Sequence, residues 1–178
     1  MTKTLIQGAL VLVENDHFAD VSLLIDQDRI AAILPNGETV ADAKPLDAKD
    51  RIIIPGLVNA HTHSHGALAR GGVPDDAILE TFLSGSAWLN LGRSHDDLAL
   101  CAQLSAVELI RKGCTACFDL FIELPGPTVE GTYAVAHAYH DVGLRAVVAP
   151  MIADQTIYQA LPGLLDSFEG PQKKQLLR

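Results

Sequence analysis

Two segments of this sequence repeat the same order of signals: an amphipathic helix pattern, a glycine and then an apolar strand pattern. The first helix pattern ends at Lys112-Gly113 and the second at Val142-Gly143, 30 residues later. Glycine supplies the left-handed conformation that closes a helix, and helices that alternate with apolar strands build a parallel sheet with the helices outside. The sequence therefore predicts repeated βα units with right-handed crossovers.

The first of these helix patterns has a clear beginning and an apolar face. Ser94 can act as its N-cap, and Asp96 and Asp97 place carboxylates at the positive end of the helix dipole. Four large aliphatic residues at helical spacing predict its buried face: Leu100, Leu104, Val107 and Ile110. By the same reasoning the second helix begins at Pro127-Thr128 and ends at Gly143.

Three apolar runs are candidates for the parallel strands of these units: residues 52–60, 114–120 and 144–152. A complete eight-unit barrel needs ~250 residues, and this chain has 178. The expected fold class is therefore α/β, an incomplete TIM-type (β/α) barrel of about three βα units. We assign residues 55–178 to this barrel portion and residues 1–54 to a separate small unit.

Residues 1–54 have a β-rich pattern of their own. Four short apolar runs alternate with polar or turn-forming stretches: 5–6, 9–13, 21–25 and 30–34. This alternation predicts a small antiparallel unit that ends in the polar segment 36–51.

The charge balance excludes several classes of partner. Lys and Arg number 13 against 22 Asp and Glu, a net charge of −9, which argues against nucleic acid and anionic membrane surfaces. No apolar run approaches the ~18 residues of a membrane helix, and the run at 9–13 is too short for a signal peptide. Three cysteines do not suggest a secreted disulfide framework. The expected location is the cytoplasm.

Two histidines stand two residues apart directly after the first apolar run, in Asn59-Ala60-His61-Thr62-His63. Alternate residues of a strand point to the same face, so both imidazoles can reach one point. Neutral imidazole binds zinc, iron, cobalt and nickel, and barrels of βα units place their chemistry at this end of their strands. An ordinary pair of histidines at a strand end is the alternative, and the two residues alone leave it open.

The segment from Ile54 to His63 resembles the first-strand signature of the amidohydrolase superfamily. Residues 20–33 resemble the small β-sandwich that precedes the barrel in its cyclic-imidate and aromatic deaminase branches. Further landmarks resemble the branch of nucleoside, guanine and triazine deaminases and chlorohydrolases: Arg70-Gly71, Asp75-Asp76, Glu108-Leu109-Ile110, Gly113-Cys114-Thr115 and Asp119. The resemblance covers about residues 5 to 153, and it implies that residues 1–54 form a small, incomplete β-sandwich.

This resemblance implies a metal-dependent hydrolase that cleaves a C–N or C–Cl bond of a small heterocyclic substrate, with deamination as the first expectation. His61 and His63 would be two ligands of one divalent metal ion, zinc first and iron, manganese or cobalt as alternatives, and the metal would activate a water. The family's other metal ligands, and the general acid/base of its deaminases, follow later strands. No catalytic residue is therefore expected within this chain, and these groups are expected beyond Arg178.

The 178 residues are accordingly expected to be inactive as they stand, as the N-terminal fragment of such an enzyme. A catalytically inactive truncated remnant and one half of a split enzyme are the alternatives, and a binding module on a βα scaffold is a third. Three βα units leave two sheet edges uncovered, which predicts marginal stability or self-association. The expected partners are a missing C-terminal half or a second copy in a homo-oligomer.

Three residues are candidates for positions near the substrate: His65, Trp88 and Asp119. His65 can lean toward the pocket of the first two histidines or belong to a loop. Asp119 can face the barrel mouth at the end of the second strand, orient a ligand from behind or serve as a cap. Nucleoside-deaminating members of the family usually carry a Glu after the first strand, and this chain has none between Thr81 and Leu100. Its absence favours a free base or another heterocycle as substrate.

The remaining histidines and cysteines are assigned structural roles. Cys114 and Cys117 have Cys-x-x-Cys spacing, but on a strand they face opposite sides and no second pair exists, so both are expected in the core. Their surroundings also lack the Pro and the His-x-Glu of cytidine-type zinc deaminases, a class that is rejected. Four histidines are expected on solvated turns or helix surfaces: His17, His95, His137 and His140.

Overall fold

The computed structural model describes residues 3–176, without the side chains at 84–88, 157, 172 and 175–176. It contains two compact units, Met1–Pro55 and Gly56–Arg178, named unit 1 and unit 2 below. Among the described residues, no helix is long and apolar enough to cross a membrane.

Unit 1 is a small sheet of short strands. They are β1 (Lys3–Gln7), β2 (Leu10–Glu14), β3 (His17–Asp26), β4 (Arg29–Pro35), β5 (Ala43–Asp47) and β6 (Ile52–Ile53). Strand β3 pairs antiparallel with β1, β2 and β4, which confirms the antiparallel pattern predicted for the first part of the chain. Strand β1 pairs in parallel with β5, and β2 pairs in parallel with β6.

Strand β5 lies inside the segment that the sequence predicts as a polar end to the unit. Four of its five residues are exposed, so it carries no alternating apolar signal. Backbone pairing with β1, from Lys3 opposite Ala43 to Gln7 opposite Asp47, makes it a strand. Sequence patterns record side-chain burial, and a strand held mainly by backbone hydrogen bonds escapes them.

The apolar residues of unit 1 are divided between a buried set and an exposed set. Leu5, Val11 and Leu23 are buried. Seven large apolar side chains are between 42% and 66% exposed: Leu10, Phe18, Ile30, Ile33, Leu46, Ile52 and Ile54. The described strands join into one sheet through β3, so the second layer of a sandwich stays a prediction.

Unit 2 contains a parallel sheet with helices beside it. Its strands are β7 (Leu57–Thr62), β8 (Cys114–Phe121) and β9 (Arg145–Pro150). Its helices are η1 (Ser64–Ala69), α1 (Leu79–Asn90), α2 (His95–Arg111), α3 (Val129–Val142), α4 (Ile157–Ala160), η2 (Leu165–Ser167) and α5 (Gly170–Leu176). The strand order β7-β8-β9 is parallel throughout, which confirms three parallel strands. The first predicted run, 52–60, is divided, because Ile52 and Ile53 form β6 in unit 1 and β7 begins at Leu57.

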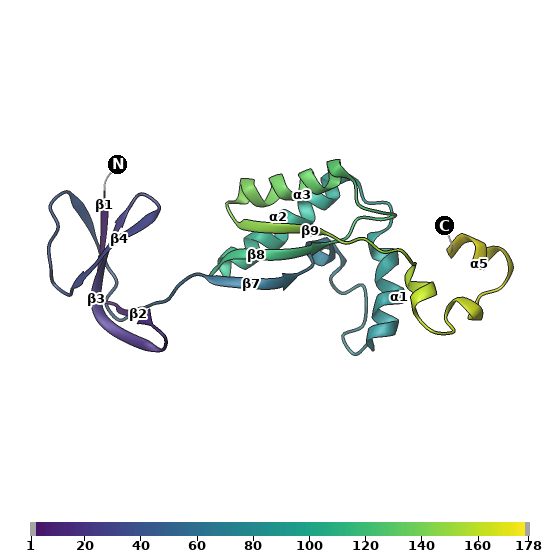
Figure 1. Cartoon of the computed structure of the whole chain (residues 1–178), viewed down its shortest axis with the longest axis horizontal. Helices are drawn as coiled ribbons and strands as arrows, with labels where there is room; N and C mark the ends of the chain where they lie inside the picture. The colour runs from purple at the N-terminus through teal and green to yellow at the C-terminus, as the bar shows by residue number, and fades with distance from the viewer. Residues whose placement is uncertain (1–2, 177–178) are drawn as a thin grey trace. The chain divides into compact units, whose positions relative to one another are not determined.

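Helices α2 and α3 lie on one side of this sheet (Figure 1), as right-handed βα units require. The core between them is formed by residues from all of these elements: Leu98, Ala102, Ala106, Cys117, Phe121, Val135, Ala138, Tyr139 and Leu144. The sheet and its two covering helices therefore fix the carboxyl ends of β7 and β8, where the predicted metal ligands lie.

The predicted helix ends are confirmed. Ser94 caps α2 in a capping box, since its hydroxyl accepts from the Asp97 N–H while its own N–H donates to the Asp97 carboxylate. Thr128 caps α3 by accepting from the Gly131 N–H at 2.9 Å. Gly113 and Gly143 follow the two helices with φ of +86° and +89°, the left-handed conformation that glycine favours.

The predicted buried face of α2 is wrong. The four large residues of the predicted stripe are between 40% and 45% exposed: Leu100, Leu104, Val107 and Ile110. The buried face consists mainly of smaller residues: Leu98, Cys101, Ala102 and Ala106. Small side chains let α2 approach the sheet and α3 closely, whereas the largest apolar residues, which dominate the hydrophobic pattern of the helix, lie outside this contact.

Candidate metal centre

His61 and His63 converge at the carboxyl end of β7. His61 lies near the end of the strand, and His63 follows its last residue. Their Nε2 atoms are 3.1 Å apart and the ring centroids 4.9 Å apart, so both imidazoles point to one place. Both residues are exposed. The alternation predicted from the His-x-His spacing is therefore present.

A backbone carbonyl fixes the tautomer of His63. Its Nδ1 lies 2.9 Å from the Leu120 carbonyl oxygen on β8, and because that oxygen can only accept, Nδ1 carries the proton. The lone pair of His63 is then on Nε2, facing His61. Histidine ligands of metals commonly donate their second ring N–H to a carbonyl or carboxylate in this way.

The spacing of the two Nε2 atoms fits one metal ion between them. With Zn–N bonds of about 2.05 Å, a 3.1 Å separation corresponds to an N–Zn–N angle of about 100°, close to the tetrahedral value. The donor set of two neutral imidazoles also suits zinc and the neighbouring transition metals. Among the described residues, no group of three or more His, Cys, Asp or Glu gathers around such a point.

The turn at residues 63–65, which follows His61 and includes His63, is held by a buried carboxylate. Asp119 on β8 accepts from the Ser64 backbone N–H at 2.9 Å and from the Ser64 hydroxyl at 2.5 Å. The Tyr139 hydroxyl on α3 donates to it at 3.1 Å. Burial, followed by the charge of Asp119, raises the pKa of Tyr139, so this hydroxyl stays protonated. Asp119 thus lies in the core behind the turn, which favours an orienting role over the predicted position at the barrel mouth.

His65 is buried beside His63, with ring centroids 5.4 Å apart. Its Nδ1 accepts from the Ile122 backbone N–H at 3.3 Å. Burial lowers its pKa to about 4, with further contributions from the neighbouring His63 and Arg93. His65 is therefore neutral near pH 7, and its predicted contact with a substrate stays a prediction.

Arg93 connects the turn at residues 63–65 to helices α1 and α2. Its Nη1 donates to the His65 carbonyl and, at 3.1 Å, to the Cys101 Sγ on α2. Its Nη2 donates to the Leu89 carbonyl of α1 at 2.8 Å. One guanidinium thus connects three elements, because its several N–H donors point in fixed directions.

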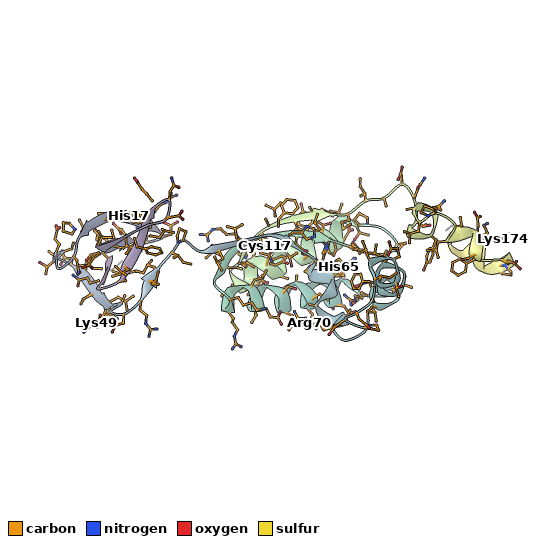
Figure 2. All side chains as sticks on the ribbon, turned by 90° about the horizontal axis from the view of Figure 1, so that it is seen from below. His17, Lys49, His65, Arg70, Cys117 and Lys174 are labelled. Carbon is orange, nitrogen blue, oxygen red and sulfur yellow. The ribbon has the colours of Figure 1, made fainter. Side chains whose placement is uncertain are left out.

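Two further landmarks of the sequence, Arg70 and Glu108, meet next to the end of η1. Arg70 and Glu108 form a two-pronged ion pair, with Nη1 donating to Oε1 at 2.5 Å. The pairing lowers the pKa of Glu108. They line a cavity of about 290 Å³ beside His63. In Figure 2, Arg70 and His65 both lie in the part of unit 2 between Cys117 and Lys174.

The other predicted residues have varied placements. Trp88 belongs to α1, and its side chain lies outside the described residues. Cys117 is buried and Cys114 half-buried, both as free thiols, in keeping with structural roles. His17, His137 and His140 are exposed as predicted. His95 is not merely solvated, since its Nε2 lies 3.1 Å from Glu123, which also accepts from Thr128.

Sequence reasoning missed three residues that organise the turn: Ser64, Arg93 and Tyr139. Ser64 gave a weak signal as a small hydroxyl residue directly after the His-x-His motif. Arg93 precedes the α2 cap, and Tyr139 occupies the buried face of α3, where a phenol needs a hydrogen-bond partner. Neither position indicates on its own which turn the residue contacts.

Comparison with known proteins found a matching family and several similar proteins. The sequence profile described as "Amidohydrolase family" matches residues 52–176. A 5-methylthioadenosine/S-adenosylhomocysteine deaminase of Haloarcula marismortui is 35% identical over 151 residues, 83% of this chain and 33% of the relative. A 5'-deoxyadenosine deaminase of Methanobrevibacter smithii is 34% identical over 148 residues, 82% of this chain and 32% of the relative. The chain thus spans about a third of the length of these curated relatives.

A solved structure shares the fold. The atrazine chlorohydrolase TrzN of Arthrobacter aurescens TC1, complexed with zinc, aligns with a TM-score of 0.74 at 23% sequence identity. The alignment covers 94% of this chain and 44% of that protein. At this identity the likeness concerns the fold alone.

Proposed function

Because the chain belongs to the amidohydrolase family, we propose that it is the N-terminal part of a metal-dependent hydrolase that removes an amino group from a heterocyclic ring. The convergence of the His61 and His63 Nε2 atoms at 3.1 Å is the observation that carries this proposal. The deaminases among its relatives and the fold shared with a zinc-complexed chlorohydrolase support it. Cleavage of a C–Cl bond is the nearest variant of the same chemistry.

In this proposal His61 and His63 hold one divalent ion, zinc first, through their Nε2 atoms. The ion, when bound, lowers the pKa of water and so supplies hydroxide for attack on an electrophilic ring carbon near neutral pH. The remaining ligands and the general acid/base follow later strands, beyond Arg178. Within this chain, the Leu120 carbonyl keeps the proton of His63 on Nδ1 and leaves Nε2 available as a ligand.

The substrate in this proposal is a small ring compound with an exocyclic amine. The curated relatives are named for adenosine derivatives, while this chain has no Glu between Thr81 and Leu100. A free base or another heterocycle therefore stands beside an adenosine derivative as a candidate substrate. We place the reaction in the cytoplasm, which the free thiols of the three cysteines support.

The test uses the protein from its natural source. We expect an intact mass well above 19.0 kDa, about one metal ion per chain and ammonia release from a panel of adenosine derivatives, free purines and aminotriazines. A mass of 19.0 kDa with little metal and no ammonia release would instead identify an inactive remnant. A metal-loaded chain of 19.0 kDa that is active only with a second polypeptide would identify one half of a split enzyme.

A further inference from the structure

A fully buried carboxylate lies directly behind the turn that carries His63. Asp119 is 0% exposed, and its two oxygens accept the three hydrogen bonds from Ser64 and Tyr139. Among the described residues, no Lys, Arg or His forms an ion pair with it. Three donors and no cation therefore surround this carboxylate.

A residue of this kind is a poor choice for stability alone. Burying a carboxylate costs several kcal/mol of solvation even in a relaxed protein, and hydrogen bonds from neutral donors offset only part of that cost. An apolar side chain of similar volume often stabilises such a site equally well. The presence of Asp119 is thus better explained by the groups that it holds in place.

Those groups belong to the residue that follows His63. Ser64 is the first residue of η1, and His63, at the N-cap position, makes no capping hydrogen bond with its side chain. Asp119 takes over that role from β8 by accepting from both the N–H and the hydroxyl of Ser64. The next residue of β8, Leu120, accepts from His63 Nδ1. Two adjacent residues of β8 therefore hold two adjacent residues of the turn.

Of the two β8 residues, Asp119 is the one that acts through its side chain. The carbonyl of Leu120 is available whatever residue stands there, but the hydrogen bonds to Ser64 require a carboxylate at position 119. Tyr139 orients that carboxylate from the α3 side. Loss of the carboxylate would free the Ser64 N–H and let the turn move away from Leu120, which would change the direction of the His63 ring.

We propose that Asp119, with Ser64 and Tyr139, forms a buried clamp that positions His63 for metal binding. Asp119 is then a positioning residue, since it touches neither of the two ligand nitrogens. The clamp keeps the proton of His63 on Nδ1 and holds its Nε2 3.1 Å from that of His61. This inference rests on the proposed role of the two histidines as metal ligands.

The first test uses the metal-free chain and needs no activity. Long-range ¹H–¹⁵N spectra of the histidine rings distinguish the two neutral tautomers, and the His63→Ala variant assigns the signals of His63. We expect the Nδ1–H tautomer in the wild-type chain. We expect a mixture with the Nε2–H tautomer in Asp119→Ala and Ser64→Ala, and an unchanged spectrum in both variants would overturn the clamp.

The second test measures zinc affinity by calorimetry on the full chain. Asp119→Ala is expected to weaken binding about 10-fold or more, the usual effect of removing a group that orients a metal ligand. Tyr139→Phe should weaken it less, because the two hydrogen bonds that Ser64 donates to Asp119 remain. Val135→Ala is the matched control. It shortens a buried side chain on α3, the helix that carries Tyr139, without removing any hydrogen bond of the clamp.

The outcomes separate this inference from the proposed function. If zinc binding depends on His63 but Asp119→Ala and Val135→Ala bind equally well, the clamp is wrong and the proposed function stands. If the wild-type chain binds no zinc through His61 and His63, the proposed function fails and the tautomer spectra decide on the clamp. If Asp119→Ala does not fold, Ser64→Ala and Tyr139→Phe are judged by the same two measurements.

Discussion

The turn at residues 63–65 has two sides with opposite character. Behind it, Ser64 and His65 are buried, and Asp119, Ile122 and Arg93 satisfy their polar groups. In front of it, His61 and His63 are exposed and direct their Nε2 atoms at each other. The structure thus orders the back of the turn thoroughly and leaves the front as two imidazoles at a fixed spacing.

This difference indicates how the site works. A ligand pair that is oriented before the metal arrives loses little conformational freedom on binding, and the hydrogen bonds that orient it lie on the side away from the metal. Substitutions at the front should therefore change metal affinity with little change in stability. Substitutions at the back of the turn should change both the metal affinity and the stability of the fold.

The largest effect on metal binding is expected at the front. His61→Ala and His63→Ala should each weaken zinc binding by about 100-fold or more, beyond the usual effect of an orienting group, because each removes a ligand. Their unfolding midpoints should stay near that of the wild type, since both residues are exposed. Equilibrium dialysis with zinc measures the affinity, and His137→Ala on the exposed side of α3 is the control. If one of these variants binds zinc as tightly as the control does, the histidine that it lacks is not a metal ligand.

At the back, the largest expected effect on stability is pH dependence through His65. The folded metal-free chain protonates His65 only near pH 4, whereas the unfolded chain does so near 6.5. The unfolded state therefore binds the extra proton between these values, and stability present above pH 6.5 is lost as the pH falls toward 4. The shift corresponds to roughly 3 kcal/mol in the free energy of unfolding.

Urea unfolding at pH 7 and pH 5 measures this loss. His65→Asn keeps an acceptor for the Ile122 N–H and removes the titration, so its stability should fall less between the two pH values. Equal losses in the variant and the wild type would show that His65 is not the group responsible.

A smaller effect on stability is expected from Arg93. Arg93→Met removes the hydrogen bonds to His65, Leu89 and Cys101, and should lower the free energy of unfolding by about 2 kcal/mol. It should also weaken zinc binding, because the turn loses its connection to α1 and α2. Arg111→Met at the exposed end of α2 is the control for loss of charge. Urea midpoints that are equal for the two variants would argue against a connecting role for Arg93.

The smallest effect is expected away from the turn. Thr128→Ala removes the N-cap of α3 and should cost about 1 kcal/mol of stability. Zinc affinity should not change, since none of the hydrogen bonds described for the turn involves Thr128. Calorimetry that shows weaker zinc binding in this variant would mean that affinity follows the stability of unit 2, not the order of the turn.

Local sequence signals predicted the parts of unit 2 that depend on neighbours in the chain. Ser94, Thr128, Gly113 and Gly143 end their helices as expected because caps are formed by residues three or four apart. The pairing of His61 with His63 was predictable for the same reason, since alternation along a strand is local.

The arrangement behind the turn was not predictable in this way. Asp119 contacts Ser64 across 55 residues of sequence and Tyr139 across 20, so only the packing of β8 against η1 and α3 brings them together. The prediction of the buried face of α2 was wrong for a related reason. Periodicity identified an apolar stripe, but the described partners of α2 are α3, η1 and β8, and the core side of α2 consists of smaller residues such as Ala102 and Ala106.

The most direct test of the central claim is a zinc titration of the wild-type chain followed by histidine ¹⁵N spectra. Zinc should shift the Nε2 signals of His61 and His63 together and leave the Nδ1–H of His63 in place, while the other five of the seven histidines keep their signals. Zinc-dependent changes that miss these two residues, or that occur at His63 Nδ1, would contradict the proposed metal centre.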